Sequence, residues 1–265
     1  MLELRHISKT FYPGTVHEKT ALQDLSLMLQ TGDFVTILGS NGAGKSTLFN
    51  AVAGGFAVDS GHIVLDGQEL TGMPDYKRSK FIGRMFQDPM RGTAANMEIQ
   101  ENLAMALRRG KSRGLGWGIK KNEKDFYREA LAQLDLGLQT RMTSKVGLLS
   151  GGQRQALTLL MATLQKPKLL LLDEHTAALD PKTARKVLDL TEKIVDEQNL
   201  TALMVTHNMK DAIQIGNRLI MMHEGRIIYD VAGEEKKNLQ VEDLLERFEK
   251  VSGEEFANDR MMLAK

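Results

Sequence analysis

A glycine-rich loop at residues 39–47 contains the residue types that hold a polyphosphate. It reads Gly-Ser-Asn-Gly-Ala-Gly-Lys-Ser-Thr and lies between an apolar run at 34–38 and an apolar helical segment at 48–53. Polyphosphate needs many donors near several charged oxygens, and glycines let backbone N–H groups converge by allowing positive φ angles. The following helix points its positive dipole end at the same anion. The loop therefore predicts a nucleoside triphosphate site.

Each part of this loop has an expected role. Lys45 would bridge the β- and γ-phosphates, the hydroxyl of Ser46 would bind Mg²⁺, and Thr47 would donate to the α-phosphate. The flanking strand and helix favour this interpretation over a glycine-rich turn with an incidental lysine. The predicted nucleotide-binding residues of the loop are Gly39, Ser40, Asn41, Gly42, Ala43, Gly44, Lys45, Ser46 and Thr47.

Two adjacent acids indicate hydrolysis. Four leucines at 169–172 lead directly into Asp173 and Glu174, so a buried strand is expected to deliver both carboxylates at its carboxyl end. Since neighbouring strand residues point to opposite faces, Asp173 would hold Mg²⁺ while Glu174 polarises the attacking water as general base. The alternatives are an acidic pair that caps a turn and a helical leucine run. Pro167 and the polar residues that follow favour a segment of strand length.

Composition limits the class of protein. The 265 residues suffice for one large domain or one domain with an insert, and a hydrophobic content of 42% supports a sizeable core. Because 35 basic residues balance 34 acidic ones, the charge argues against a general nucleic-acid binder. The absence of cysteine excludes disulfides and thiolate metal sites. We find no bilayer-spanning apolar stretch and no signal peptide, so we expect a soluble chain whose membrane role would need a partner.

The hydrophobic pattern changes twice along the chain. It predicts antiparallel strands at the beginning, with a tight hairpin at Asp66-Gly67. Helical periodicity follows from about 92 to 165, where Phe126, Ala130 and Leu134 are expected to share one buried face. Strand, helix and strand then return at 169–172, 181–197 and 200–206. We predict an α/β fold with an inserted helical region, followed by a charged tail with one amphipathic helix.

A second anion-binding pattern, Leu-Ser-Gly-Gly-Gln at 149–153, belongs to an ordered series of motifs. The other members are the glycine loop, Met-Phe-Gln-Asp-Pro around Gln87, the leucine run with its two acids, Ala-Ala-Leu-Asp at 177–180 and Val-Thr-His at 205–207. This series resembles the nucleotide-binding subunits of ABC (ATP-binding cassette) transporters over about residues 1–231. The resemblance implies a P-loop NTPase core with an antiparallel β subdomain and a helical subdomain at about 90–165, followed by a tail at 232–265.

The resemblance also implies roles for residues outside the glycine loop. Two chains would close head to tail on two ATP molecules, and the helix start at 150–153 would grip the γ-phosphate held by the opposite chain. Gln87 would reach Mg²⁺ and the attacking water, and Asp180 would communicate across the dimer while also serving as a helix N-cap. His207 would stabilise charge beside the γ-phosphate. The residues assigned to the opposite chain's nucleotide are Ser150, Gly151, Gly152 and Gln153.

Three positions leave alternatives open. Phe11 resembles the aromatic residue that stacks on adenine. One alternative is that Tyr12 takes this role, and another is that Phe11 is an ordinary residue of the hydrophobic core. His175 stands where the family commonly has proline after the catalytic glutamate, which affects the expected loop geometry. The stretch 108–121 carries six basic residues and Trp117. It is interpreted as a solvated loop, or as a segment near lipid headgroups or the permease.

We therefore predict a Mg²⁺-dependent ATPase that powers a membrane transporter. Its expected partners are integral permease subunits, an identical or related second ATPase chain and a solute-binding protein, with no nucleic acid. It would be cytoplasmic and peripheral on the inner face of the membrane. An importer of a small solute such as an amino acid, possibly aromatic, is favoured over an exporter. A non-transport cassette ATPase and a simple phosphotransferase are the other classes, and the second leaves the motifs at 149–153 and 205–207 unexplained.

Overall fold

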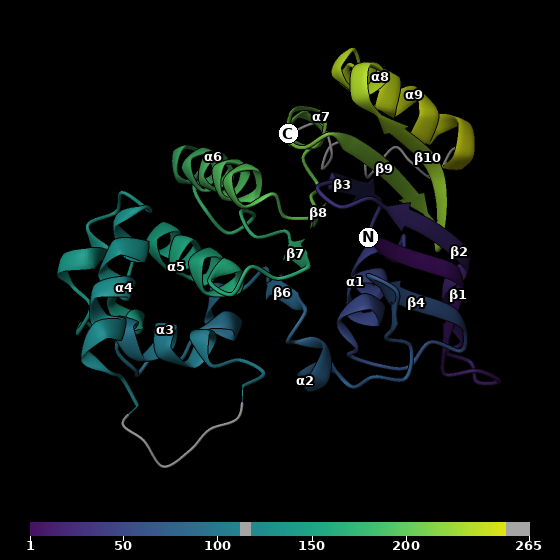
Figure 1. Cartoon of the computed structure of the whole chain (residues 1–265). Coiled ribbons are helices and arrows are strands. Elements are labelled where there is room, and N and C mark those ends of the chain that lie inside the picture. Colours follow the sequence, from purple (N-terminus) through teal and green to yellow (C-terminus); the bar gives the residue numbers. More distant parts are fainter. Residues whose placement is uncertain (112–117, 253–265) are drawn as a thin grey trace. The chain divides into compact units, whose positions relative to one another are not determined.

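A computed structural model describes residues 1–111 and 118–252, which form two compact units. The first unit contains Met1–Arg78 and the chain from Asn199 onward, and the second contains Ser79–Gln198. The purple and blue N-terminal elements thus share a unit with the yellow C-terminal helices (Figure 1).

The first unit contains an antiparallel sheet in the order β2-β1-β4-β5. Leucines alternate toward its buried face, with Leu2 opposite Leu29 and Leu4 opposite Leu27. Asp66 and Gly67 both have positive φ, as a tight hairpin between β4 and β5 requires, so the predicted hairpin is confirmed. The strands are β1 (Leu2–Phe11), β2 (Lys19–Leu29), β4 (Ser60–Leu65) and β5 (Gln68–Glu69).

The other strands of the first unit are ordered β10-β9-β3-β8. Strands β9, β3 and β8 run parallel, and β3 is buried along its whole length, which explains its continuous apolar sequence. The helix α1 follows β3 and ends at Gly54, which has a left-handed conformation. These elements are β3 (Phe34–Gly39), α1 (Lys45–Ala53), α2 (Asp75–Arg78), β8 (Ala202–Val205), α7 (Met209–Gln214), β9 (Arg218–His223) and β10 (Arg226–Ala232).

The amphipathic helix predicted in the C-terminal tail is present and packs on the first unit. Leu244 and Phe248 of α9 (Val241–Ser252) are fully buried in one hydrophobic cluster with Leu38 of β3 and Met221 of β9. The short helix α8 (Gly233–Lys237) precedes α9, and both helices lie along β10 (Figure 1). The elements of the charged tail therefore complete a hydrophobic core.

The second unit combines a parallel strand pair with helices. Strands β6 and β7 pair in register, and the leucines of β7 are fully buried. The predicted strand, helical region and following helix are confirmed. The elements are β6 (Ile82–Met85), the 3₁₀ turn η1 (Pro89–Gly92), α3 (Ile99–Leu107), α4 (Lys121–Ala132), the 3₁₀ turns η2 (Leu138–Thr140) and η3 (Val146–Leu148), α5 (Gly151–Thr163), β7 (Leu169–Asp173) and α6 (Pro181–Gln198).

The predicted buried face of α4 is wrong by one residue. Phe126 is 43% exposed, whereas Tyr127 is fully buried together with Ala130 and Leu131. In a helix the residues three and four positions apart share a face, and Tyr127, Ala130, Leu131 and Leu134 satisfy that spacing. The phenylalanine fitted the four-residue repeat equally well, so sequence alone could not exclude it.

The basic stretch 108–121 is partly anchored. Arg108 forms an ion pair with Glu123 at 2.8 Å, and Arg109 donates to the carbonyl oxygen of Ala162 at 3.2 Å. These two arginines therefore hold the end of α3 to neighbouring helices instead of serving as free surface charges. Residues 112–117, which include Arg113 and Trp117 of the membrane-surface hypothesis, lie outside the described residues.

Candidate functional site

The phosphate-binding loop begins where β3 meets β9. A Cβ atom on Gly39 would lie 2.5 Å from the carbonyl oxygen of Met222, so no side chain fits there. The predicted positive φ is wrong for Gly39 and correct for Gly42 and Gly44, whose φ angles are 84° and 99°. Gly39 is required by the close approach of β9, which the sequence pattern alone did not reveal.

Gly44 combines both constraints at the start of α1. It is the N-cap of the helix in a left-handed conformation, and a Cβ atom there would collide with the carbonyl oxygen of Ala21. The neighbouring N–H of Gly225 donates to the carbonyl oxygen of Ala43 at 3.0 Å, which ties the loop to the β9–β10 turn. The chain is thus held in a conformation that leaves the helix N-terminus without a side-chain cap. Backbone N–H groups at such a terminus suit an anionic ligand.

Lys45 lies inside this loop. Its side chain is buried, and its ammonium donates to the carbonyl oxygens of Gly39 at 2.6 Å and Ser40 at 2.9 Å. The folded loop therefore holds a positive charge ready for a phosphate. Ser46 is exposed in the first turn of α1, and Thr47 is half-buried beside it.

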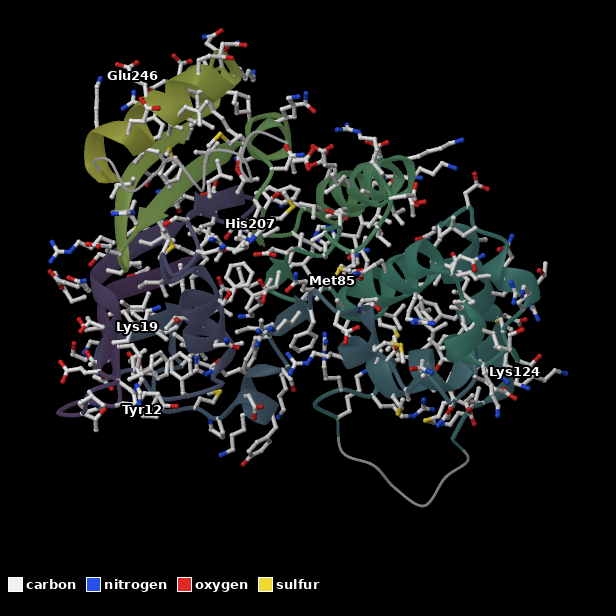
Figure 2. All side chains as sticks on the ribbon, turned by 180° about the vertical axis from the view of Figure 1, so that it is seen from behind. Tyr12, Lys19, Met85, Lys124, His207 and Glu246 are labelled. Atoms are coloured by element: carbon white, nitrogen blue, oxygen red, sulfur yellow. The ribbon has the colours of Figure 1, made fainter. Side chains whose placement is uncertain are left out.

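His207 follows the strand next to β3. Strands β3 and β8 run parallel with Ile37 opposite Val205, and the N–H of Thr206 donates to the carbonyl oxygen of Ile37 at 3.2 Å. The phosphate-binding loop and His207, which is labelled in Figure 2, thus leave the carboxyl ends of two adjacent parallel strands. That edge of a parallel sheet is where α/β proteins commonly bind ligands.

The two aromatic candidates for the adenine have different surroundings. Phe11 is half-buried and contacts Phe56 edge to face, with the ring centroids 5.4 Å apart. The ammonium of Lys9 lies 5.6 Å from the centroids of both rings. Tyr12, which is labelled in Figure 2, is 68% exposed with a positive φ of 53°. Phe11 therefore belongs to a small aromatic cluster, while Tyr12 stands in solvent.

In the second unit, Gln87 and Asp173 also lie at the carboxyl ends of two adjacent parallel strands. Asp173 ends β7, and Gln87 lies two residues beyond the end of the parallel strand β6. Arg84 of β6 approaches the Asp173 carboxylate at 3.8 Å and stacks on the ring of Phe86, with its guanidinium carbon 4.6 Å from the centroid. Arg84 belongs to none of the sequence motifs. The sequence signal for a functional role of Arg84 is a basic residue within a short, otherwise apolar strand.

Glu174 does not continue the strand. Its φ is +44°, in the left-handed region, so the alternation of strand side chains does not set its direction and that argument was wrong. A non-glycine residue held there costs about 1–3 kcal/mol, and such conformations concentrate at functional sites. The N–H of Ala177 donates to the carbonyl oxygen of Glu174 at 3.0 Å and closes the turn.

His175 occupies a closed environment directly after Glu174. It is buried, and its Nε2 atom lies 3.2 Å from the hydroxyl of Thr191. That hydroxyl donates to the carbonyl oxygen of Val187 at 2.7 Å, so it must accept a hydrogen bond from Nε2–H. Burial lowers the pKa of His175 to about 4. The residue is therefore neutral near pH 7 and fastens the turn to α6.

The signature segment, Leu-Ser-Gly-Gly-Gln at 149–153, forms a capped start of α5 in the second unit. The Ser150 hydroxyl accepts from the N–H of Gln153 at 3.3 Å, and the Gln153 side chain accepts from the N–H of Ser150 at 3.2 Å. A Cβ atom on Gly152 would collide with Thr183, and one on Gly151 would lie 3.1 Å from Leu179. The two glycines therefore allow α5 to approach the start of α6 closely.

Asp180 is the N-cap of α6, as one of its two interpretations predicted. Its carboxylate accepts from the N–H of Thr183 at 3.1 Å. Hydrogen bonds from the Thr183 side chain and backbone lower the pKa of Asp180. The carboxylate is exposed, so capping leaves part of it accessible to solvent.

The residues present suit a magnesium nucleotide. Mg²⁺ typically takes one or two protein oxygens and completes its shell with water and phosphate oxygens. An exposed hydroxyl at Ser46 and a carboxylate at Asp173 are such donors. The described residues contain no cluster of three or more His, Cys, Asp or Glu side chains around a common point. Within the same residues, no helix is both long and apolar enough to cross a lipid bilayer.

Comparison with known proteins places this site in a family. The family model for ABC transporters matches residues 22–177. The chain is 47% identical over 249 residues to a tyrosine transport ATP-binding protein of Clostridioides difficile, covering 94% of this chain and 99% of that protein. It is 35% identical over 231 residues to a methionine import ATP-binding protein of Enterococcus faecalis, covering 86% of this chain and 64% of that protein.

A solved structure agrees with the fold. A dimeric post-hydrolysis ATP-binding cassette bound to ADP and Pi matches with a TM-score of 0.72 at 27% identity, covering 88% of this chain and 98% of that one. The predicted fold class, a P-loop ATPase core with antiparallel β and helical parts, is confirmed by this match. The chain belongs to the ABC transporter family, as one of its ATP-binding and ATP-hydrolysing members.

Proposed function

We propose that this chain is the ATPase subunit of an importer whose cargo is an amino acid, with an aromatic one favoured. The tyrosine transport relative supports this proposal because the two proteins match over nearly their full lengths. The methionine import relative supports an amino acid more generally, although the chain spans only 64% of that protein. The cargo does not follow from the ATPase residues themselves, which act on ATP.

The phosphate-binding loop is the observation that carries the ATPase part of the proposal. A collision at Gly39 and a left-handed N-cap at Gly44 exclude side chains from the loop, and Lys45 supplies a buried ammonium. In the proposal, backbone N–H groups bind the β-phosphate and Lys45 bridges the β- and γ-phosphates. Thr47 donates to the α-phosphate, and Phe11 stacks on the adenine.

We assign Mg²⁺ to the hydroxyl of Ser46, the carboxylate of Asp173 and the side chain of Gln87. The ion would neutralise the charge that develops on the phosphate oxygens during phosphoryl transfer.

Hydrolysis is assigned to Glu174, Gln87 and His207. Glu174 accepts a proton from the attacking water, and Gln87 orients that water. His207 donates a hydrogen bond to the γ-phosphate oxygens as charge develops there. The left-handed backbone of Glu174 supports its role, because such strained conformations concentrate at functional sites.

A second ATPase chain completes the site in this proposal. Ser150, Gly151, Gly152 and Gln153 would bind the γ-phosphate held by the other chain, and Asp180 would signal between the chains. The dimeric relative bound to ADP and Pi supports this pairing. The partners at the membrane are permease subunits and a solute-binding protein, which place the chain at the inner face of the cell membrane.

The catalytic part is tested with Glu174→Gln. The amide keeps the size of the side chain but cannot accept the proton, so kcat for ATP should fall about 100-fold or more while ATP binding is retained. The variant should also accumulate as an ATP-bound dimer in size-exclusion chromatography. The control is Glu197→Gln, an exposed acid of α6. Wild-type turnover in Glu174→Gln would exclude the assigned role.

A further inference from the structure

Lys236 is a buried cation in the C-terminal tail that the proposed site does not use. Its side chain is 2% exposed, although lysine is among the residues least often buried. Its ammonium donates to the carbonyl oxygen of Gly216 at 2.9 Å and also to that of Ile215. Burying an ammonium is costly unless hydrogen bonds compensate it, so these carbonyls are specific partners.

The two carbonyls belong to the segment that ends α7. The last carbonyls of a helix have no partner within the helix and need donors from elsewhere. On α7, the hydroxyl of Thr36 donates to the carbonyl oxygen of Ala212 at 2.8 Å. Lys236 donates to the carbonyl oxygens of the two residues that follow the helix. A cation at a helix C-terminus also interacts favourably with the helix dipole.

The other end of α7 carries the proposed γ-phosphate residue. His207 is two residues before Met209, the first residue of α7, and Asn208 caps the helix by accepting from the N–H of Asp211 at 3.1 Å. A shift of this single short helix along its axis would therefore move His207. Residues 215–217, which follow the C-terminal end of α7, are packed closely against β3, because a Cβ atom on Gly216 would collide with the carbonyl oxygen of Phe34.

The tail helices pack directly on α7. Leu244 and Phe248 of α9 are fully buried in the same hydrophobic cluster as Met209 and Ala212 of α7. Packing in such a cluster is dense, so a change in α9 is transmitted to α7.

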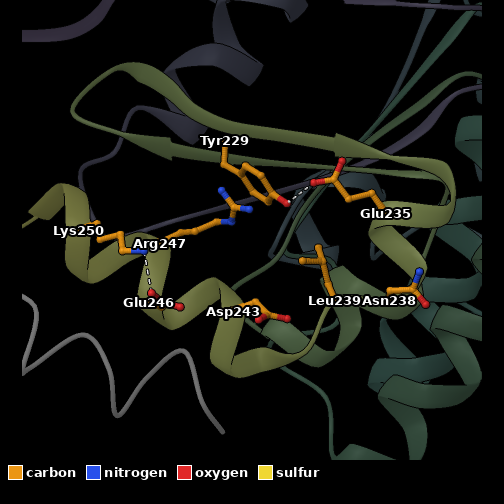
Figure 3. A pocket seen from close by; sticks show the side chains of 8 residues that line it. All are labelled: Tyr229, Glu235, Asn238, Leu239, Asp243, Glu246, Arg247 and Lys250. Carbon is orange, nitrogen blue, oxygen red and sulfur yellow. Dashed lines mark hydrogen bonds and ion pairs between the residues drawn. The ribbon is translucent and has the colours of Figure 1, made fainter.

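Figure 3 shows the outer contacts of the same helices, around a pocket of about 380 Å³. The guanidinium of Arg247 lies 3.8 Å from the ring centroid of Tyr229, whose hydroxyl contacts Glu235 of α8 at 3.2 Å. These contacts attach α8 and α9 to β10.

We propose that Lys236 is a positioning residue for His207, and that the C-terminal helices set the position of His207 by clamping the end of α7. The inference rests on the proposed role of His207 in ATP hydrolysis. It goes beyond that role because it gives the tail a function in turnover without any contact between the tail and the nucleotide. In this proposal the effect of Lys236 on His207 is transmitted through α7.

The test is a double-mutant cycle on the full chain. Lys236→Met keeps the length of the side chain and removes the ammonium, so kcat for ATP should fall about tenfold while nucleotide binding changes little. In a His207→Ala background the same substitution should lower kcat no further, because the residue through which it acts is gone. Lys236→Arg retains donors at this position and should recover part of the lost turnover. Circular dichroism at the assay temperature verifies that each variant is folded.

The matched control is Lys237→Met, which removes the adjacent lysine of the same helix, 72% exposed and paired with Glu234. It should leave kcat unchanged. An equal loss from Lys236→Met in both backgrounds, or no loss in either, would overturn the inference. If Lys236→Met does not stay folded, Phe248→Leu loosens α9 while leaving Lys236 in place, and it is measured in the same cycle and judged in the same way.

The cycle also separates the inference from the function on which it rests. Wild-type turnover in His207→Ala would remove the proposed role of His207, and the inference with it. Slow turnover in His207→Ala with wild-type turnover in folded Lys236→Met would remove the inference alone.

Discussion

At the residue scale, the glycines of the phosphate-binding loop meet different physical demands. Gly39 has an ordinary backbone conformation and is required by the nearby carbonyl of Met222. Gly42 has a positive φ in an exposed part of the loop, while Gly44 has a positive φ and no room for a side chain. The sequence motif predicted the loop correctly but could not distinguish these reasons, because two of them depend on strands distant in the sequence.

His175 makes stability depend on pH. Its pKa in the folded chain is about 4, below its ordinary value of 6.5, because burial disfavours the charged ring. The contribution of the neutral His175 ring to the free energy of unfolding is therefore fully present above pH 6.5. It is lost as the pH falls toward 4, since His175 in the unfolded chain binds a proton at a higher pH than in the folded chain. By linkage, the loss approaches about 3 kcal/mol.

Urea unfolding of the wild type and of His175→Leu between pH 7 and pH 4 measures this effect. The leucine variant should show a flatter decline in unfolding free energy over that range, because it has no ring to protonate. His62→Leu is the control, since His62 is exposed and its ring is 67% accessible. Parallel pH profiles for the wild type and His175→Leu would contradict the assignment.

At the element scale, the amphipathic pattern identified helices better than it identified their faces. It predicted α1 and α6 with their approximate bounds and predicted one amphipathic helix in the tail, where α9 lies. In α4 it selected Phe126 where the structure buries Tyr127. A helix with two aromatic residues side by side offers two registers, and only the neighbouring helices decide between them.

Two phenylalanines on different helices give a test of burial. Phe248→Ala should reduce the unfolding free energy by about 3–5 kcal/mol, because it removes a fully buried ring from the cluster beneath α9. Phe126→Ala removes a ring that is 43% exposed and should cost much less. Chemical denaturation of both variants compares them directly. A larger loss from Phe126→Ala would show that α4 packs in the register first predicted.

The residues that the sequence did not reveal share one physical property. Arg84, Arg78 and Lys236 act through tertiary hydrogen bonds or ion pairs, and no local pattern marks them. Arg78 is buried, and its guanidinium donates to the carbonyl oxygens of Ala51 and Val52 at the end of α1. Motifs predicted the groups proposed to act on ATP, whereas the cations that hold the helices in place required the folded structure.

At the scale of the whole molecule, the proposed catalytic groups are divided between the two units. The first unit contains the phosphate-binding loop and His207, and the second contains Gln87, Glu174 and the signature helix. In the proposed function, turnover therefore depends on both units and on a second chain. This division suits a protein whose ATP cycle is coupled to a membrane partner.

The transporter proposal is tested in cells that produce this protein. Solubilised membranes should yield integral permease chains together with the affinity-tagged protein, and the amount should be the same for Glu174→Gln, because that substitution keeps the size and shape of the side chain. Cells that carry only Glu174→Gln should lose energised uptake of labelled tyrosine or a related amino acid. Purification without any integral membrane protein, or unchanged uptake of every amino acid tested, would contradict the importer.

The order of strands in the first unit affects the synthesis of the protein. Strand β3 is made early, yet its parallel neighbours β8 and β9 begin at Ala202 and Arg218, and Gly39 packs against Met222. At bacterial or eukaryotic ribosomal speeds, about 10–30 s separate the emergence of β3 from that of its neighbours. The nascent chain must keep this strongly apolar strand from aggregating during that interval. The packing partner of Gly39, the first glycine of the phosphate-binding loop, therefore becomes available only after Met222 has been translated.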